Sequence, residues 1–242
     1  ILNRSLDRFG IIISGGTVTL SDLTVTTSTG SMAVRIFGDP EVHILSGSYT
    51  GGDDAVFVFG GTVTITAGTF ICITDLENDG PLATDAGVIN LAQGSIASPP
   101  KTEWGKDTTP DVITIGPPVA RIGDTVTGTD YLFMEDAVAA VQDGETITLL
   151  TDLTSGGTTA TVQIENTDKD FTRDLDGHSI HNTGLNEALV VSSSFSGTLT
   201  VADGTLTSNS LRSTIDAGGG HLRLQGLTVT NAGNNVDCSA VT

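Results

Sequence analysis

Pairs of aspartates in turn-like segments are the residues of this sequence best suited, by type and spacing, to hold a cation. Asp53 and Asp54 follow two glycines, whereas Asp174 and Asp176 alternate with a leucine in a segment of strand character. Alternate residues of a strand lie on one face about 7 Å apart, and carboxylate oxygens are ligands that Ca²⁺ prefers. These four aspartates are therefore the candidate calcium ligands. Aspartate is also common in turns because its side chain bonds nearby backbone, so ordinary turns explain the same pairs without a metal.

Lyase chemistry that uses Ca²⁺ would also require a basic residue near the metal to remove a proton. Arg173 precedes Asp174 directly and is expected on the opposite face of the strand, which makes it a poor base. Asp168 and Asp170 flank Lys169 just before this strand and form a further acidic cluster. We assign no catalytic residue and no cofactor-binding residue, and Ca²⁺ is the one cofactor left open.

Histidines and glycine-rich segments give weaker signals. His178 and His181 are three residues apart, and residues three apart on a strand face opposite sides, so they are not expected to bind one metal. His178 follows a glycine and is expected to hydrogen-bond backbone in a turn. The segments Gly15-Gly16 and Gly218–Gly220 have neither the lysine nor the strand-to-helix context of a phosphate-binding loop.

The charge of the chain excludes two classes of partner. Its 242 residues include 29 Asp and Glu against 10 Lys and Arg, which gives a formal net charge of −19. Such a chain repels nucleic-acid phosphates and anionic lipid surfaces, and no apolar run approaches the ~20 residues that cross a membrane. We therefore expect no nucleic acid as partner and no membrane insertion. Cys72 and Cys238 lack metal-ligand spacing, and Cys72 is expected to be buried.

A Thr-apolar-Thr phrase recurs along the chain and is typical of strands with one buried face. Its copies are Thr17–Leu20, Leu23–Thr26, Thr62–Ile65, Thr146–Leu149, Thr198–Val201, Thr205–Thr207 and Leu227–Thr230. Strands this short cannot bury their own apolar row, so they must stack into a coil. The repeat predicts an all-β solenoid of parallel β-helix type, with a hairpin-built β fold as the alternative. Ice binding by the threonine ladder is a further alternative, against which the varying rung lengths argue.

Two blocks flank a proline-rich stretch. Residues 1–97 are interpreted as β-helix rungs that form the C-terminal part of a module; in them, Ser46–Tyr49 and Ala67–Phe70 are the same rung element, each with a glycine turn and a stacking aromatic. Residues 98–118 contain five of the seven prolines and are interpreted as a linker or crossing, because proline interrupts strand pairing. Trp104 is expected to pack on a domain edge.

Residues 119–242 are interpreted as a β-helix module that begins with a capping helix at about 131–142. Phe133, Ala137, Val138 and Val141 share one face of this helix. The helix ends before Gly144, as expected for a glycine stop. Such a helix would cover the apolar row and the strand groups of the first rung.

Three segments of the second block match a known pattern: Ala120–Asp124, Met134–Leu153 and Phe171–Ile180. They resemble the opening strand, the capping helix with its first strand, and a Leu-Asn-Gly-His-Thr-Ile rung of pectin-lyase-like right-handed β-helix modules, which occur in large secreted or surface proteins of Gram-positive bacteria. Phe133 departs from the threonine N-cap of that family, and Arg173 departs from its apolar strand residue. The resemblance implies a right-handed coil, an extracellular or cell-wall-attached protein, and generally no demonstrated reaction.

The leading hypothesis is a non-catalytic extracellular scaffold or adhesin-type module that binds host glycan or protein. The alternative is a carbohydrate-active lyase or hydrolase of pectin-lyase type, which an exterior groove with three clustered carboxylates and a basic residue would favour. The opening residues, Ile1–Ser5, read as the middle of a longer chain. We also expect weak end-to-end self-association through Ile1–Ile13 or Val229–Thr242, where a rung would be uncovered.

Overall fold

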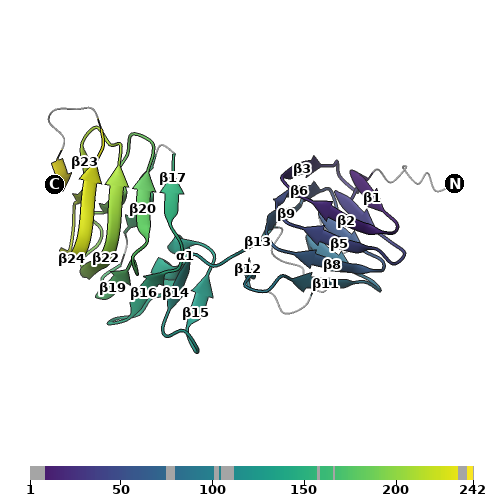
Figure 1. Cartoon of the computed structure of the whole chain (residues 1–242), viewed down its shortest axis with the longest axis horizontal. Coiled ribbons are helices and arrows are strands. Elements are labelled where there is room, and N and C mark those ends of the chain that lie inside the picture. Colours follow the sequence, from purple (N-terminus) through teal and green to yellow (C-terminus); the bar gives the residue numbers. More distant parts are fainter. Residues whose placement is uncertain are drawn as a thin grey trace. The chain divides into compact units, whose positions relative to one another are not determined.

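The structure, a computed structural model, describes residues 9–74, 80–100, 104, 112–156, 159–165, 167–233 and 239–241. Short strands stack into a β-solenoid of about 8 turns, and about 50% of the chain is strand. The chain divides into two compact units, Ile1–Pro117 and Pro118–Thr242, whose helices and strands are labelled in Figure 1. The predicted fold class, an all-β parallel β-helix with a capping helix, is confirmed.

The first unit winds its strands into three sheets, and each turn of the coil adds one strand to each sheet (Figure 1). The first sheet contains β1 (Ile11–Ile13), β4 (Val34–Ile36), β7 (Val56–Val58) and β10 (Leu82–Thr84). The second contains β2 (Thr17–Leu20), β5 (Glu41–Ile44), β8 (Thr62–Ile65) and β11 (Val88–Leu91). The third contains β3 (Leu23–Thr26), β6 (Gly47–Gly51), β9 (Gly68–Cys72), β13 (Val112–Gly116) and β12 (Ile96–Ser98).

Alternation of apolar and polar residues decides which side chains enter the coil. In β8, Val63 and Ile65 are fully buried while Thr62 and Thr64 remain half-exposed on the outer face. The same pattern holds in β5, and each inward residue lies beside its equivalent one turn away. Stacking therefore joins the apolar rows of single strands into one continuous core.

The third sheet of the first unit departs from a regular coil. β13 pairs antiparallel with β9 on one side and with β12 on the other, so it lies between strands of successive turns. Part of the proline-rich stretch, residues 98–118, is thus a core strand, with Ile113 and Ile115 buried. Trp104 packs against the same apolar cluster, as expected for a tryptophan on a domain edge.

The second unit begins with β14 (Ala120–Ile122), β15 (Thr129–Tyr131) and α1 (Met134–Ala140). Its coil then contains β16 (Thr146–Leu149), β17 (Leu153–Ser155), β18 (Val162–Ile164), β19 (Phe171–Asp174), β20 (Ser179–Asn182), β21 (Leu189–Val191), β22 (Thr198–Ser208), β23 (Ser213–Ala217), β24 (His221–Asn231) and β25 (Ser239–Val241). β22 and β24 each cover two faces of the coil, because β22 pairs with β19 through its first half and with β20 through its second.

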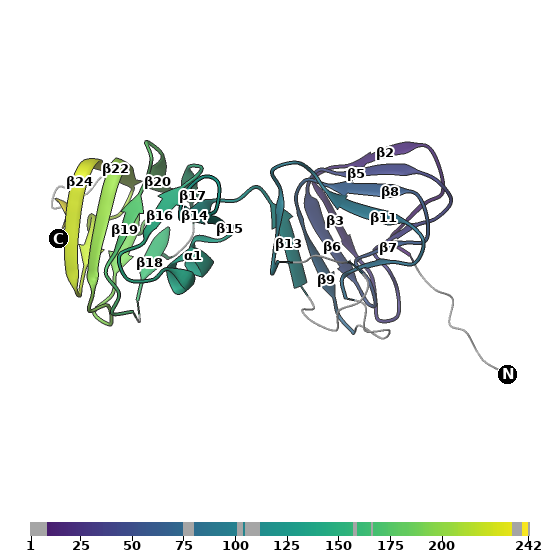
Figure 2. The same ribbon diagram turned by 90° about the horizontal axis from the view of Figure 1, so that it is seen from below.

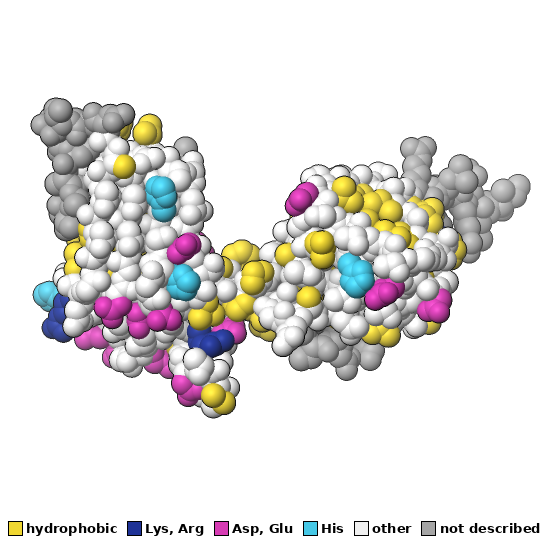
Figure 3. Space-filling view, in the orientation of Figure 1, with side chains coloured by type: hydrophobic (Ala, Val, Ile, Leu, Met, Phe, Trp, Pro, Cys, Tyr) yellow, Lys and Arg dark blue, Asp and Glu magenta, His cyan; other side chains and the backbone are white. Residues whose placement is uncertain are grey.

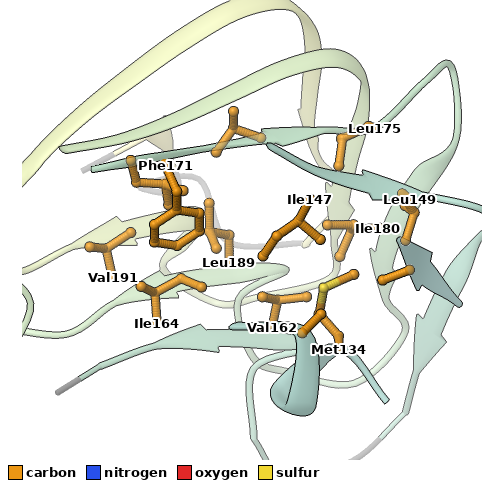
Figure 4. Close-up of a cluster of buried hydrophobic side chains, with 14 of the residues drawn as sticks. Met134, Ile147, Leu149, Val162, Ile164, Phe171, Leu175, Ile180, Leu189 and Val191 are labelled. Atoms are coloured by element: carbon orange, nitrogen blue, oxygen red, sulfur yellow. The ribbon is translucent and has the colours of Figure 1, made fainter. Parts of the chain in front are cut away.

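The start of this coil is covered in two ways. β14 pairs antiparallel with β16 and carries β15 on its other edge, so the backbone edge of β16, one strand of the first rung, is paired. α1 lies beside β14, β15 and β18 (Figure 2) and contributes Met134, Ala137 and Val141 to the apolar cluster of the unit. Figure 4 shows Met134 pointing into this cluster beside Val162.

The helix is shorter and rotated relative to the sequence prediction. It spans Met134–Ala140 instead of 131–142, and its buried residues are Met134 and Ala137. Phe133, expected in the core, is the N-cap residue with extended backbone and is 41% exposed. Val138 is only partly buried. The side chains that face the core are therefore those of Met134, Ala137 and Val141. The sequence prediction placed the neighbouring aromatic residue Phe133 on this face instead of Met134.

Burial of the inward side chains decreases at two rungs. In β22, Leu199 and Val201 are fully buried, whereas Leu224, the neighbour of Val201 on β24, is 39% exposed. In the first unit, Val18 of β2 is partly buried whereas its neighbour Val42 is fully buried. The apolar row thus reaches the surface at the first rung of one unit and at the last long strand of the other.

Candidate functional site

A concave cleft lies along the capping helix. It has a volume of about 650 Å³ and lies between α1 and the segment that enters and forms β18. Its walls are Glu135, Val138 and Ala139 from the helix, Thr159, Ala160, Thr161, Gln163 and Glu165 around β18, and Thr167, Asp168 and Lys169 before β19. The cleft exists because a rounded helix packs against a strand segment and leaves the outer part of their contact unfilled.

The cleft combines an apolar strip with hydrogen-bonding groups. Val138, Ala139 and Ala160 supply the apolar surface, and threonine hydroxyls and the Gln163 amide supply donors and acceptors. Gln163 points outward because β18 buries its neighbours Val162 and Ile164. The hydroxyl of Thr161 bonds the carbonyl of His181 at 3.3 Å, which fixes this wall to the adjacent turn of the coil. Sites that bind small molecules usually combine an apolar lining with a few placed polar groups, as this cleft does.

Lys169 joins the cleft to the end of the helix. Its Nζ donates a hydrogen bond of 2.6 Å to the carbonyl oxygen of Val141, the C-cap residue of α1. Carbonyl groups at a helix C-terminus lack partners within the helix and carry partial negative charge, so a cation is favourable there. The ammonium group thus has a structural role, because it donates a hydrogen bond to the end of the helix.

Three carboxylates, those of Glu135, Glu165 and Asp168, also line the cleft. Glu165 accepts a long contact of 3.4 Å from the Gln163 amide. Among the residues that the structure describes, no group of three or more His, Cys, Asp or Glu side chains is close enough to share a metal ion. As hydrogen-bond acceptors, separated carboxylates suit hydroxyl groups of a ligand better than a cation.

A second cavity of about 360 Å³ adjoins the first near the N-terminus of α1. Both cavities are lined by Glu135 and by Thr159–Thr161. Leu132, Phe133 and Leu153 are among the residues that line the second cavity. The two cavities share one wall, so an elongated ligand could contact both along the helix.

Arg173 lies in the core of the same unit. It is fully buried between Ile147 and Val201 in the ladder of inward residues, and none of its three guanidinium nitrogens has a hydrogen-bond partner. Burial lowers the pKa of Arg173 to about 10, and the charge of Glu135 acts in the opposite direction. The expectation that Arg173 faces away from Asp174 is correct, and the side chain is not part of the cleft wall.

The predicted calcium ligands belong to two different units. Asp53 and Asp54 belong to the first unit, where Asp54 is buried, and Asp174 and Asp176 belong to the second. The prediction that Asp174 and Asp176 share one face of a strand is wrong, because β19 ends at Asp174. Asp176 has φ of 47°, and its backbone N–H donates to Oδ1 of Asp174 at 2.9 Å. This pair forms an ordinary aspartate turn.

His178 hydrogen-bonds backbone in its turn as expected, because its backbone N–H donates to the carbonyl of Leu175 at 2.7 Å. Its imidazole also lies 3.5 Å from the carboxylate of Asp152. Asp152 is held by the backbone N–H of Ser179 at 2.8 Å, and hydrogen bonding from Ser179 lowers the pKa of Asp152. Cys72 is buried as expected, and Cys238 lies outside the described residues.

The threonine ladders are mixed on the second sheet and more regular on the third. On β2, β5, β8 and β11, the outward column contains Thr19, His43, Thr64 and Asn90. On the third sheet, hydroxyl side chains align across five strands as Thr24, Ser48, Thr69, Thr114 and Ser98. The neighbouring column of the third sheet ends in Ile71 and Val112, so the paired Thr-x-Thr array that ice binding requires is incomplete.

Sequence reasoning identified Asp168 and Lys169 as a cluster but missed the cleft itself. Glu135 and Gln163 are brought together only by docking of the helix on β18, which the sequence pattern does not specify. Comparison of the chain with protein-family models, with curated proteins and with solved structures finds no match. No helix in the described part of the chain has the length and apolar character to cross a membrane.

Proposed function

We propose that the chain is a non-catalytic, extracellular β-helix module of a surface scaffold or adhesin, and that it binds a neutral glycan segment in the cleft along α1. The module would belong with pectin-lyase-like β-helix modules of secreted or cell-wall-attached proteins from Gram-positive bacteria. The sequence resemblance and the parallel β-helix fold support this origin.

The composition of the cleft is the observation that carries the proposal. Sugars present C–H faces and hydroxyl groups, and this cleft offers Val138, Ala139 and Ala160 beside Thr159, Thr161 and Gln163. Its carboxylates accept hydrogen bonds from hydroxyl groups, but they repel anionic sugars. The only cation among its described walls, Lys169, already bonds the Val141 carbonyl. A neutral sugar is therefore favoured over a uronate.

Binding of neutral oligosaccharides tests the proposal. We expect oligomers of glucose, N-acetylglucosamine or mannose to give saturation-transfer NMR signals with the parent chain. Ala139→Trp should abolish them, because the indole fills the cleft from an exposed helix position. Val126→Trp is the matched control, since Val126 is 88% exposed in the same unit and lies outside the cleft. Signals that survive Ala139→Trp, or no signal with any neutral oligomer, would contradict glycan binding at this site.

The alternative, a carbohydrate-active lyase or hydrolase, is favoured by one observation. The cleft is lined by the three carboxylates Glu135, Glu165 and Asp168 together with Lys169, although the described carboxylates form no group of three that could share a metal ion. A hydrolase would use two of the carboxylates as acid and base. Release of reducing ends from a polysaccharide, lost in Glu135→Gln or Asp168→Asn, would establish the enzyme. A stoichiometric calorimetric Ca²⁺ site of micromolar affinity would favour the lyase form.

A further inference from the structure

Half of the phenylalanines of the chain gather on one outer surface of the first unit. Of eight phenylalanines, four lie near the outer face of the sheet formed by β1, β4, β7 and β10. We define the aromatic surface as Phe9, Ile12, Arg35, Phe37, Phe57 and Phe59. Because β4 and β7 direct the residues on either side of Arg35 and Phe57 into the core, these two side chains lie on the outer face of the sheet, where Phe57 is largely covered and 9% exposed.

Ring contacts and strand pairing join Phe9, Ile12, Arg35, Phe57 and Phe59, and Phe37 directly follows β4. The rings of Phe57 and Phe59 have centroids 4.3 Å apart. Ile12, Arg35 and Phe57 lie side by side on adjacent strands. Ile12 is 56% exposed and Phe37 is 41% exposed. Single exposed apolar residues are ordinary, but a contiguous set that includes several aromatic rings indicates an interaction surface.

Arg35 is held between two of these rings. The centre of its guanidinium lies 4.6 Å from the ring centroid of Phe9 and 4.8 Å from that of Phe59. Its Nε is buried without a hydrogen bond. A planar guanidinium between two rings is fixed in direction by cation–π attraction. Such fixation reduces the entropy that is lost when it pairs with a carboxylate.

Charge makes Arg35 distinctive. It is the only Lys or Arg among the described residues of the first unit, in a chain whose net charge is −19. In the view of Figure 3, acidic residues are visible on both units, whereas the Lys and Arg side chains visible there all belong to the second. No carboxylate among the described residues pairs with Arg35. Among the described residues of the first unit, the one Lys or Arg side chain thus lies in the middle of the aromatic surface.

We infer that the aromatic surface docks a protein partner that offers apolar side chains and one carboxylate, with the carboxylate paired to Arg35. A glycan is disfavoured here, because Arg35 is the only hydrogen-bonding side chain of the surface and sugar hydroxyls would remain unpaired. Arginine and aromatic residues are also the types that contribute most at protein interfaces. This inference concerns the first unit and stands independently of the cleft in the second.

A matched pair of peptides tests the assignment. Acetyl-Phe-Glu-Leu-amide and acetyl-Phe-Gln-Leu-amide differ only in the charge, and binding of each is followed by NMR of the Arg35 Nε–H and the phenylalanine rings. We expect the Glu peptide to bind about tenfold more tightly than the Gln peptide, as a charge-assisted pair predicts. Arg35→Gln should remove that difference, and Phe37→Thr should weaken both peptides.

Control variants and ligands show whether binding occurs at the aromatic surface and what binds there. Val88→Thr changes a residue that is 50% exposed on β11, in a different sheet of the same unit, and should bind as the parent does. If the Arg35→Gln variant does not fold, the Phe37→Thr variant still tests the inference, because Phe37 is exposed and its replacement should weaken binding of both peptides. Equal binding of the two peptides, or binding of neither, overturns the inference. Glucuronate binding as tight as that of the Glu peptide would show a glycan site. Shifts that depend on protein concentration alone would show that a second copy occupies the surface.

Discussion

Tyr49 and Phe70 stack within the core of the first unit, with ring centroids 5.4 Å apart and planes inclined by 7°. Both side chains are fully buried, and they lie in register on β6 and β9. Each lies two residues after a glycine with positive φ, of 128° at Gly47 and 150° at Gly68. A Cβ at Gly47 would approach the carbonyl oxygen of Leu23 to 2.5 Å, so the glycines fix the turn from which each ring enters the core.

The stability of the first unit should fall at alkaline pH because of Tyr49. Burial raises the pKa of Tyr49 above its ordinary value of 10.0, so the unfolded chain releases the phenolic proton first. The free energy of unfolding then decreases as pH rises above about 10. Tyr49→Phe should remove this part of the pH dependence and cost about 1 kcal/mol near neutral pH, since the hydroxyl donates to the Ser46 carbonyl at 3.1 Å. Urea unfolding at several pH values measures both effects, and an unchanged alkaline slope in the variant would contradict this account.

Two neighbouring substitutions test which face of α1 is buried. Ala137→Asp should destabilise the second unit by several kcal/mol, because it places a charge in a fully buried position. Val138→Asp should cost much less, since Val138 lies at the edge of the core and lines the cleft. Thermal unfolding compares the two variants directly. Equal losses of stability would mean that the helix is not oriented by Met134, Ala137 and Val141.

Replacing Arg173 by methionine should stabilise the second unit. The guanidinium is buried without a hydrogen bond, and a buried charge without partners is less favourable than an apolar side chain of similar length. We expect a gain of about 1–4 kcal/mol in the free energy of unfolding. The gain should shrink above pH about 10, because burial lowers the pKa of Arg173 to about 10 and the folded chain then sheds the charge. A methionine variant less stable than the parent would indicate that the arginine is compensated.

Self-association should be weak and should strengthen as salt increases. Leu224 is 39% exposed on β24 although its neighbour Val201 is fully buried, so this rung offers an apolar surface to another copy. Repulsion between chains of net charge −19 opposes contact at low salt and is screened within about 10 Å at 0.1 M. Light scattering at two ionic strengths measures the effect, with Leu224→Thr as the variant that should reduce it. A strict monomer at high salt and high concentration would contradict the prediction.

Strand positions and their inward faces could be predicted from the sequence because they depend on local periodicity. The Thr-apolar-Thr segments Thr17–Leu20, Leu23–Thr26 and Thr62–Ile65 are β2, β3 and β8 with the predicted bounds. The equivalence of Tyr49 and Phe70 was also predictable, since the same four-residue element precedes and includes each aromatic. In these segments, alternation, turn residues and stacking all favour the same structure.

The cleft and the antiparallel strand β13 could not be predicted in this way. Glu135 and Thr161 line the same cleft only because α1 packs against β18. Such packing depends on the shapes of the two surfaces, which the periodicity of the sequence does not specify. β13 was obscured by the prolines around it, although Ile113 and Ile115 alternate with polar neighbours as a strand requires. Asp176 shows a further limit: a residue with φ of 47° ends the strand pattern, and sequence spacing alone does not mark that break.

The place of β13 between β9 and β12 has a consequence for synthesis on the ribosome. Turns of a coil that pair only with the preceding turn can form in the order in which the chain emerges, as β3, β6 and β9 do. β12 (Ile96–Ser98) instead pairs with β13 (Val112–Gly116), a strand that is made after it. The nascent chain must therefore hold β12 unpaired until residue 116 has left the exit tunnel, and the edge of β9 is open to other chains during that interval. Translation speed across residues 99–111 then sets how long the growing chain is vulnerable to aggregation.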